Sequence, residues 1–113
     1  EGFPAAREAM RIYQAFLREG KSENDALALT LPHIIAVLTD TNLLHRGGPE
    51  GLRFAQQKAK EVLALPEEKR MQALSQLDAE FIRRNLSPGG SADMLGLAVL
   101  MHALEETAQD MVK

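Results

Sequence analysis

The sequence predicts an all-α fold, a bundle of about five helices with a buried, apolar C-terminal helix. Apolar residues recur at helical spacing, no segment alternates apolar and polar residues as a strand does, and the connections are short and rich in Gly or Pro. Of the 113 residues, 45% are hydrophobic and 26% are charged, which is typical of a globular protein. We therefore expect residues 1–113 to form a single helical domain.

The first helix is predicted from a proline to a glycine. Pro4 suits the first helical position, because its missing N–H has no partner there. Apolar residues between positions 9 and 17 follow at helical spacing, and Gly20 suits the position after the C-terminal cap.

The second helix is predicted to be longer. Ser22, with Asp25 three residues later, resembles a capping box, and a strongly apolar run covers residues 26–44. Pro32 lies inside this run and removes one backbone hydrogen bond, so we expect a kink or a break there.

The third and fourth helices are predicted to begin at prolines. Pro49 opens a third helix that stops before residue 65, and Pro66 suits the first position of a fourth. Residues 83–85 close the fourth helix. Its expected buried face carries Met71, Leu74, Leu77 and Phe81.

A loop with two adjacent glycines precedes the last helix. Residues 85–93 read Asn-Leu-Ser-Pro-Gly-Gly-Ser-Ala-Asp and lead into the apolar run 94–104, so other helices are expected to surround this helix until it frays near residues 107–113. Either Ser87 with Pro88, or Ser91 with Asp93, suits its start. Free backbone N–H groups beside glycines are suited to phosphate. The alternative is an ordinary turn with an N-cap.

A second polar cluster follows the apolar run of the second helix. Such groups are costly to bury unless they are paired or bind something. The cluster contains Asp40, Thr41, Asn42, His45 and Arg46, followed by Gly47 and Gly48.

Two interpretations of this cluster remain open. As a binding site, Asp40 and Asp93 are the carboxylates near the glycine loops and suit Mg²⁺ held partly through substrate phosphates. Arg46 is suited to gripping phosphate, and His45 to orienting a group or moving a proton. As a helix C-cap, Gly47 would take the left-handed conformation and Asp40 would pair with Arg46.

Composition excludes several function classes. A net charge of −3 without a basic run argues against nucleic-acid and membrane-surface partners. The longest apolar run is too short for a bilayer, and no signal-peptide pattern is present. The absence of cysteine fits a reducing compartment, so we expect a cytoplasmic protein.

Residues 40–52 and 86–95 together resemble two motifs of the triphosphoribosyl-dephospho-CoA synthase family, in the right order and spacing. The resemblance covers most of the chain. It implies a transferase that joins ATP to 3′-dephospho-CoA with release of adenine. The product is the precursor of the prosthetic group of the acyl carrier subunits of citrate lyase and malonate decarboxylase.

The resemblance also implies roles for the residues of both motifs. Gly89, Gly90 and Ser91 would cradle phosphate and Arg46 would pair with it. The full set expected to contact the substrates, ATP and 3′-dephospho-CoA, is Asn42, Arg46, Gly47, Gly48, Ser87, Gly89, Gly90 and Ser91. Asp40 and Asp93 would hold Mg²⁺, either of them could instead act as the base, and His45 completes the predicted catalytic set.

Members of this family are substantially longer than this chain, whose first residue, Glu1, is not an initiator methionine. We therefore expect the C-terminal portion of an enzyme that lacks some catalytic groups when isolated. Apolar surface would then be covered by the missing N-terminal part or by a second copy in a homodimer. The alternative function is a non-catalytic helical scaffold or interaction domain whose polar loops are only caps.

Overall fold

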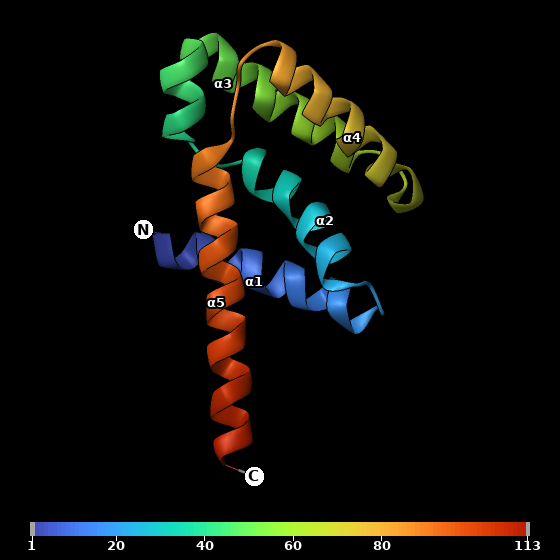
Figure 1. Ribbon diagram of the computed structural model, residues 1–113, viewed down its shortest axis with the longest axis vertical. Helices are drawn as coiled ribbons and strands as arrows, with labels where there is room; N and C mark the ends of the chain where they lie inside the picture. Colours follow the sequence, from blue (N-terminus) through green and yellow to red (C-terminus); the bar gives the residue numbers. More distant parts are fainter. Residues whose placement is uncertain (1, 113) are drawn as a thin grey trace.

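Residues 2–112, the part of the chain that the computed structural model describes, fold into five α-helices and contain no strand. Figure 1 shows α3 and α4 side by side at one end, and α5 crossing α1. The predicted all-α fold of about five helices is therefore confirmed. The helices are α1 (Gly2–Arg18), α2 (Glu23–Ile35), α3 (Thr41–Leu63), α4 (Glu67–Arg83) and α5 (Gly89–Met111).

The turn between α1 and α2 follows the predicted capping pattern. Gly20 has a φ of 94°, a left-handed conformation that glycine adopts at low cost after a helix. The side chain of Ser22 accepts a hydrogen bond from the backbone N–H of Asp25 at 3.1 Å. Only the start differs, because α1 begins before Pro4.

The helix at the centre of the bundle is α2. It packs against the other four helices, and each of the three hydrophobic clusters contains at least one of its buried residues. Ile35 packs toward α3 and α4, Ile34 toward α1 and α5, and Leu29 toward α1. The prediction that the C-terminal helix is the surrounded one was therefore wrong.

The second helix begins after Ser22 as predicted, but its predicted extent through residue 44 was wrong. α2 ends at Ile35, three residues after Pro32, and a new helix begins at Thr41 with Asp40 as its N-cap. Aspartate is favoured at this position because its carboxylate accepts hydrogen bonds from N–H groups that otherwise lack partners. The polar cluster that we interpreted as following a helix therefore opens one, and Asp40 does not pair with Arg46 as the C-cap interpretation required.

A kink divides α3. Gly48 has φ 68° and ψ −173°, which is non-helical, and the helix resumes at Pro49 as predicted. The left-handed residue is thus Gly48, whereas Gly47 remains helical. Because the kink redirects the chain, residues 41–47 lie near the start of α5, while the rest of α3 runs beside α4 (Figure 1).

The fourth helix begins one residue later than predicted, since Pro66 is its N-cap and Glu67 its first residue. Leu77 and Phe81 are buried, and Leu74 is half-buried against the same cluster. The predicted burial of Met71 was wrong, because this side chain is 40% exposed.

Only part of α5 is covered by other helices. Its buried residues are Ser91, Leu95 and Ala98, whereas Leu100 and Leu104 are more than half exposed. The helix continues to Met111, so the predicted fraying from residue 107 was wrong for the described residues; residue 113 lies outside them. Within residues 2–112, no helix combines the length and the apolarity needed to cross a membrane.

Candidate functional site

The two motifs lie against each other and run in opposite directions. Arg46 Nη1 donates to Asn85 Oδ1 at 3.2 Å, and Asn42 Nδ2 donates to the carbonyl oxygen of Ser87 at 3.0 Å. At the far end of the pairing, Asp40 contacts Ser91. The kink in α3 and the loop after α4 thus bring together residues that lie 39 to 51 positions apart in the sequence.

The carboxylate of Asp40 lies between two helix N-termini. Its Oδ1 accepts from the backbone N–H groups of Asn42 at 2.9 Å and Leu43 at 3.1 Å, which are the second and third residues of α3. The same carboxylate accepts from the N–H groups of Gly90 at 3.2 Å and Ser91 at 2.8 Å, the second and third residues of α5. Asp40 therefore caps both helices.

This shared cap explains where α5 begins. Its own N-cap residue, Pro88, forms no side-chain hydrogen bond, so neither predicted start of the helix is the observed one. Asp40 supplies the acceptor from another helix, and the Ser91 hydroxyl adds a further hydrogen bond to Oδ2 at 2.8 Å. The positive ends of two helix dipoles then meet one negative charge, which is favourable.

The environment of Asp40 keeps its carboxylate ionised. Asp40 is 1% exposed, and this burial by itself raises its pKa. Hydrogen bonds from the backbone of Ser91, Leu43 and Gly90, and from the Ser91 hydroxyl, outweigh the burial and hold the pKa below its ordinary value. The anion that the glycine loop binds in this structure is therefore the side chain of Asp40.

The glycines of both motifs allow this close approach. A Cβ atom on Gly89 would lie 2.7 Å from Asn42 Nδ2, and one on Gly90 would lie 3.0 Å from Asp40 Oδ1. A Cβ on Gly47 would lie 2.5 Å from Leu86 Cδ2. Such distances are too short for ordinary packing. The motif glycines are thus needed where one motif contacts the other.

The predicted site residues divide into buried and exposed groups. Asp40 and Ser91 are buried. The residues that are only partly exposed are Asn42, Gly47, Gly48, Ser87, Gly89 and Gly90. His45, Arg46 and Asp93 are exposed, and the side chain of Asp93 forms no hydrogen bond or ion pair with any of residues 2–112. Within the same residues, no group of three His, Asp or Glu side chains is arranged to hold a metal ion.

Sequence reasoning missed two residues that shape this site. Asn85 has a φ of 56°, a left-handed conformation that asparagine tolerates better than most residues, and it directs its side chain to Arg46. Leu86 fills the space that Gly47 and Gly51 leave open on one face of α3. The spacing of these two glycines, four residues apart on a helix, was the available signal.

Comparison with known proteins identifies the family of this chain. The model of the CitG family, described as ATP:dephospho-CoA triphosphoribosyl transferase, matches residues 1–111. The 2-(5″-triphosphoribosyl)-3′-dephosphocoenzyme-A synthase of Klebsiella pneumoniae is 42% identical over 106 residues, which are 90% of this chain and 35% of that protein. No solved structure matches.

Proteins named as probable synthases of the same kind are similar at the same level. The protein of Salmonella gallinarum is 42% identical over 100 residues, 85% of this chain and 33% of its own length. That of Vibrio cholerae is 42% identical over 101 residues, 87% of this chain and 32% of its own length. The chain thus spans about a third of the curated relatives that it matches. It belongs to the CitG family of ATP:dephospho-CoA triphosphoribosyl transferases.

Proposed function

We propose that this chain is part of a transferase that joins the triphosphoribosyl group of ATP to 3′-dephospho-CoA and releases adenine. The observation that carries the proposal is the juxtaposition of the two motifs, in which Arg46 contacts Asn85 and Asp40 contacts Ser91. The names of the family and of its relatives supply the two substrates and the group that is transferred. The product would serve as prosthetic-group precursor for the acyl carrier protein of citrate lyase or malonate decarboxylase, in the cytoplasm.

The reaction is a glycosyl transfer. A ribose hydroxyl oxygen of dephospho-CoA forms a bond to the anomeric carbon of the ATP ribose, and the bond from that carbon to adenine breaks. The hydroxyl proton passes to a base, adenine leaves with the electron pair of the broken bond and takes up a proton, and the triphosphate stays on the ribose. The enzyme must hold the triphosphate, stabilise a positively charged sugar carbon and position the base.

Arg46 and His45 suit two of these tasks. Arg46 is exposed, and its hydrogen bond to Asn85 occupies only one of its five N–H donors, so the guanidinium can also grip phosphate in bidentate fashion. His45 lies one residue earlier on the same exposed turn of α3 and can orient a group or carry a proton. The helix N-terminal donors of Gly90 and Ser91 are already taken by Asp40.

The two carboxylates suit different roles. Asp40 accepts five hydrogen bonds, which fill the acceptor positions of a carboxylate, so we assign it the positioning of α3 and α5 in place of the predicted Mg²⁺ and base roles. Asp93 is exposed on the first turns of α5, and we propose that it contacts the Mg²⁺ that accompanies ATP, with the phosphates supplying further ligands. Mg²⁺ would neutralise triphosphate charge there.

We propose that the exposed apolar side of α5 docks the rest of the full-length enzyme. Leu100 and Leu104 are 54% and 60% exposed, and Met111 and Val112 are more than 80% exposed. Figure 1 shows the C-terminal half of α5 extending past its crossing with α1. A second copy of the chain would cover the same residues when the chain is isolated.

Release of adenine is the direct test of the proposed function. Full-length enzyme is incubated with ATP, Mg²⁺ and 3′-dephospho-CoA, and adenine is measured by chromatography. We expect adenine only when both substrates are present, and loss of that signal in Asp93→Asn with unchanged helix content. Full turnover by this variant would contradict the role of Asp93, and absence of adenine from the wild-type enzyme would contradict the function.

A scaffold predicts a different ligand response. A thermal-shift series of the chain with ATP and Mg²⁺, with ATP alone and with dephospho-CoA tests this. Stabilisation by about 1 kcal/mol or more that needs both ATP and Mg²⁺ is expected if the triphosphate binds the folded chain.

A further inference from the structure

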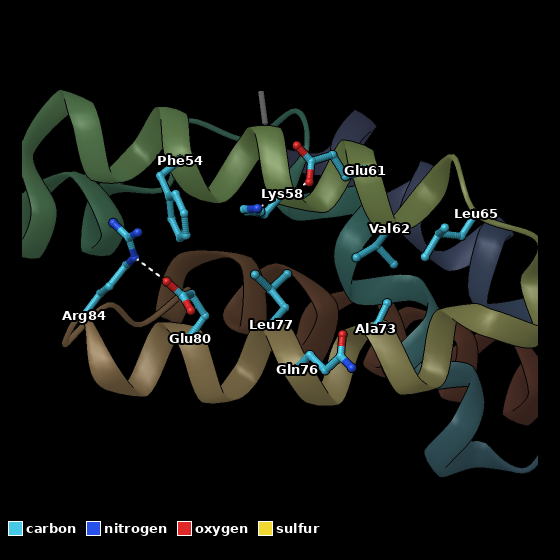
Figure 2. Close-up of a pocket in the computed structure, with 10 residues that line it drawn as sticks. All are labelled: Phe54, Lys58, Glu61, Val62, Leu65, Ala73, Gln76, Leu77, Glu80 and Arg84. Atoms are coloured by element: carbon cyan, nitrogen blue, oxygen red, sulfur yellow. Dashed lines mark hydrogen bonds and ion pairs between the residues drawn. The ribbon is translucent and has the colours of Figure 1, made fainter.

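The second half of α3 and α4 enclose a cleft that lies outside the two motifs. Its volume is about 410 Å³, within the range of small-molecule sites in proteins. Val62 and Leu77 form part of an apolar lining, and charged side chains stand at the edges. Figure 2 shows these side chains pointing from both helices into the space between them. No step of the proposed function uses this cleft.

An aromatic ring with two nearby cations lies at one end of the cleft. The guanidinium carbon of Arg84 is 3.9 Å from the centroid of the Phe54 ring, and Lys58 Nζ is 5.8 Å from it. Phe81 meets the same ring edge-on, with the centroids 6.4 Å apart, and so fixes its orientation. Figure 2 places Arg84 and Lys58 on opposite sides of Phe54. The flexible Lys58 side chain can move aside, which opens one ring face to a flat ligand.

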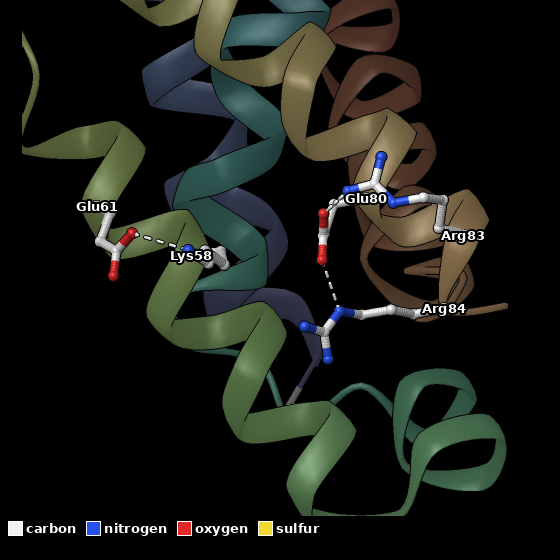
Figure 3. A network of polar contacts seen from close by, with 5 residues as sticks. All are labelled: Lys58, Glu61, Glu80, Arg83 and Arg84. Carbon is white, nitrogen blue, oxygen red and sulfur yellow. Dashed lines mark hydrogen bonds and ion pairs between the residues drawn. The ribbon is translucent and has the colours of Figure 1, made fainter.

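The charged side chains that line the cleft form ion pairs with one another. Lys58 pairs with Glu61 at 3.4 Å, and Arg84 pairs with Glu80, which also pairs with Arg83 outside the cleft (Figure 3). The side chains of the three cations are at least 43% exposed, and ion pairs of exposed groups contribute little to stability. The cations can therefore turn toward the phosphate of a ligand at small cost.

One residue of the cleft adjoins the candidate site in the sequence. Arg84 is followed directly by Asn85, whose Oδ1 accepts the hydrogen bond from Arg46 at 3.2 Å. A ligand with its base on Phe54 would find the Arg84 guanidinium, 3.9 Å from the ring centroid, beside it for a phosphate.

We infer that the α3–α4 cleft binds a purine nucleotide, with the base stacked on Phe54 and the phosphate directed to Arg84. Bases stack on aromatic rings whatever their sequence, and arginine pairs with phosphate in bidentate fashion. The inference rests on the proposed function, whose substrates ATP and 3′-dephospho-CoA both carry an adenine nucleotide. It assigns that shared group a place outside the motifs.

Chemical-shift mapping of the 113-residue chain with AMP, ATP and 3′-dephospho-CoA tests the inference. We expect amide shifts at Phe54, Leu77 and Phe81, and the nucleotide with the lowest Kd identifies which substrate the cleft serves. Phe54→Leu keeps an apolar side chain but removes the ring, and Arg84→Gln changes an exposed residue. Each should raise the Kd by about tenfold, as loss of base stacking or of a phosphate contact does.

Arg83→Gln is the matched control. This variant removes a positive charge one residue away and one of the two ion pairs of Glu80. Arg83 does not line the cleft. We expect its Kd to stay within about twofold of the wild type, since exposed charges act weakly at a distance. An equal rise in Kd for the Arg83 and Arg84 variants would mean that the nucleotide is held only by general charge attraction, and would overturn the inference.

The remaining outcomes separate this inference from the proposed function. Shifts confined to residues 40–46 and 87–93 would support the motif site and overturn nucleotide binding in the cleft. Tripolyphosphate shifting the cleft amides as strongly as AMP would mean that no base is recognised. Failure of every nucleotide to bind the chain would also overturn the inference, whereas the adenine-release assay of the full-length enzyme tests the proposed function independently. Cleft shifts that appear only with a peptide from the rest of the enzyme would identify a protein contact instead.

Discussion

The carboxylate of Asp40 accepts hydrogen bonds from both the backbone N–H and the hydroxyl of Ser91, each at 2.8 Å, although 51 residues separate the two in the chain. The same carboxylate caps the helix that begins beside it. One side chain thus fixes the relative position of two helix N-termini, and both family motifs depend on it. The stability and the geometry of the candidate site should therefore respond together when Asp40 changes.

Asp40→Ala is predicted to destabilise the chain by about 2–4 kcal/mol. Loss of one N-cap costs about 1 kcal/mol, and here two helices lose their cap while buried N–H donors are left unsatisfied. Ser22→Ala is the control, because Ser22 is an exposed N-cap that serves α2 alone. Urea unfolding at pH 7, followed by circular dichroism, compares the two variants. Equal losses would show that the link from Asp40 to α5 contributes nothing.

The stabilisation by Asp40 is predicted to disappear in acid. Its pKa in the folded state is lowered from 3.8, so the folded chain favours the ionised form more than the unfolded chain does. The contribution is present above pH 3.8 and is lost as the pH falls through the lower, folded-state pKa. The difference in unfolding free energy between wild type and Asp40→Asn should therefore shrink below pH 3.8.

Comparison with the variant at each pH removes the contribution of other titrating groups. His33 is one of them, since burial, and secondarily the charge of Arg70, lowers its pKa. The contribution of His33 to the unfolding free energy falls as the pH drops below 6.5, because the unfolded chain takes up the proton before the folded chain does. This effect is common to both proteins and cancels. A difference that stays constant from pH 7 to pH 3 would contradict the assignment to Asp40.

Two glycines of α5 should respond oppositely to alanine. A Cβ on Gly89 would lie 2.7 Å from Asn42 Nδ2, so Gly89→Ala should break the hydrogen bond from Asn42 to Ser87 and cost about 1 kcal/mol. Gly96 is exposed in mid-helix with no atom within 4 Å of an added Cβ, so Gly96→Ala should stabilise by about 0.5–1 kcal/mol. Thermal unfolding measures both. Stabilisation by Gly89→Ala would contradict the contact role of the motif glycine.

The sequence was sufficient to predict the five helices, but it was insufficient to predict which group binds the glycine loop. Local signals such as Ser22 and Gly20 act within a few residues, so capping rules predicted that turn correctly. The rules also indicated that the loop before α5 binds an anion. They could not identify that anion as Asp40, because the contact depends on the kink at Gly48 and on the path of the chain after α4.

The dependence on contacts that are distant in sequence also explains why the second helix was predicted to extend through residue 44. The apolar run continues past the end of α2 at Ile35, and the signals against one long helix were Pro32 and the preference of Asp40 for an N-cap position. Likewise, the apolar run of α5 predicted burial on all sides, but in this chain other helices cover one face of its first half. The apolar pattern states which residues favour burial, and the available neighbours decide which of them become buried.

That uncovered face of α5 leads to the last prediction, which concerns self-association. Leu100 and Leu104 lie four residues apart on one helix and are both more than half exposed, so a second copy can bury them when the rest of the enzyme is absent. We expect the isolated chain to sediment as a dimer at high concentration, and the double variant Leu100→Gln, Leu104→Gln to sediment as a monomer.

Ile82→Gln is the control, because Ile82 is 70% exposed on α4, and this variant should remain dimeric. The unfolding free energy of the monomeric double variant should differ little from that of the wild type at low concentration, since exposed substitutions change stability by about 0.5 kcal/mol or less. A wild-type chain that stays monomeric at every concentration would contradict the prediction, because the apolar face would then be stable in water without a partner.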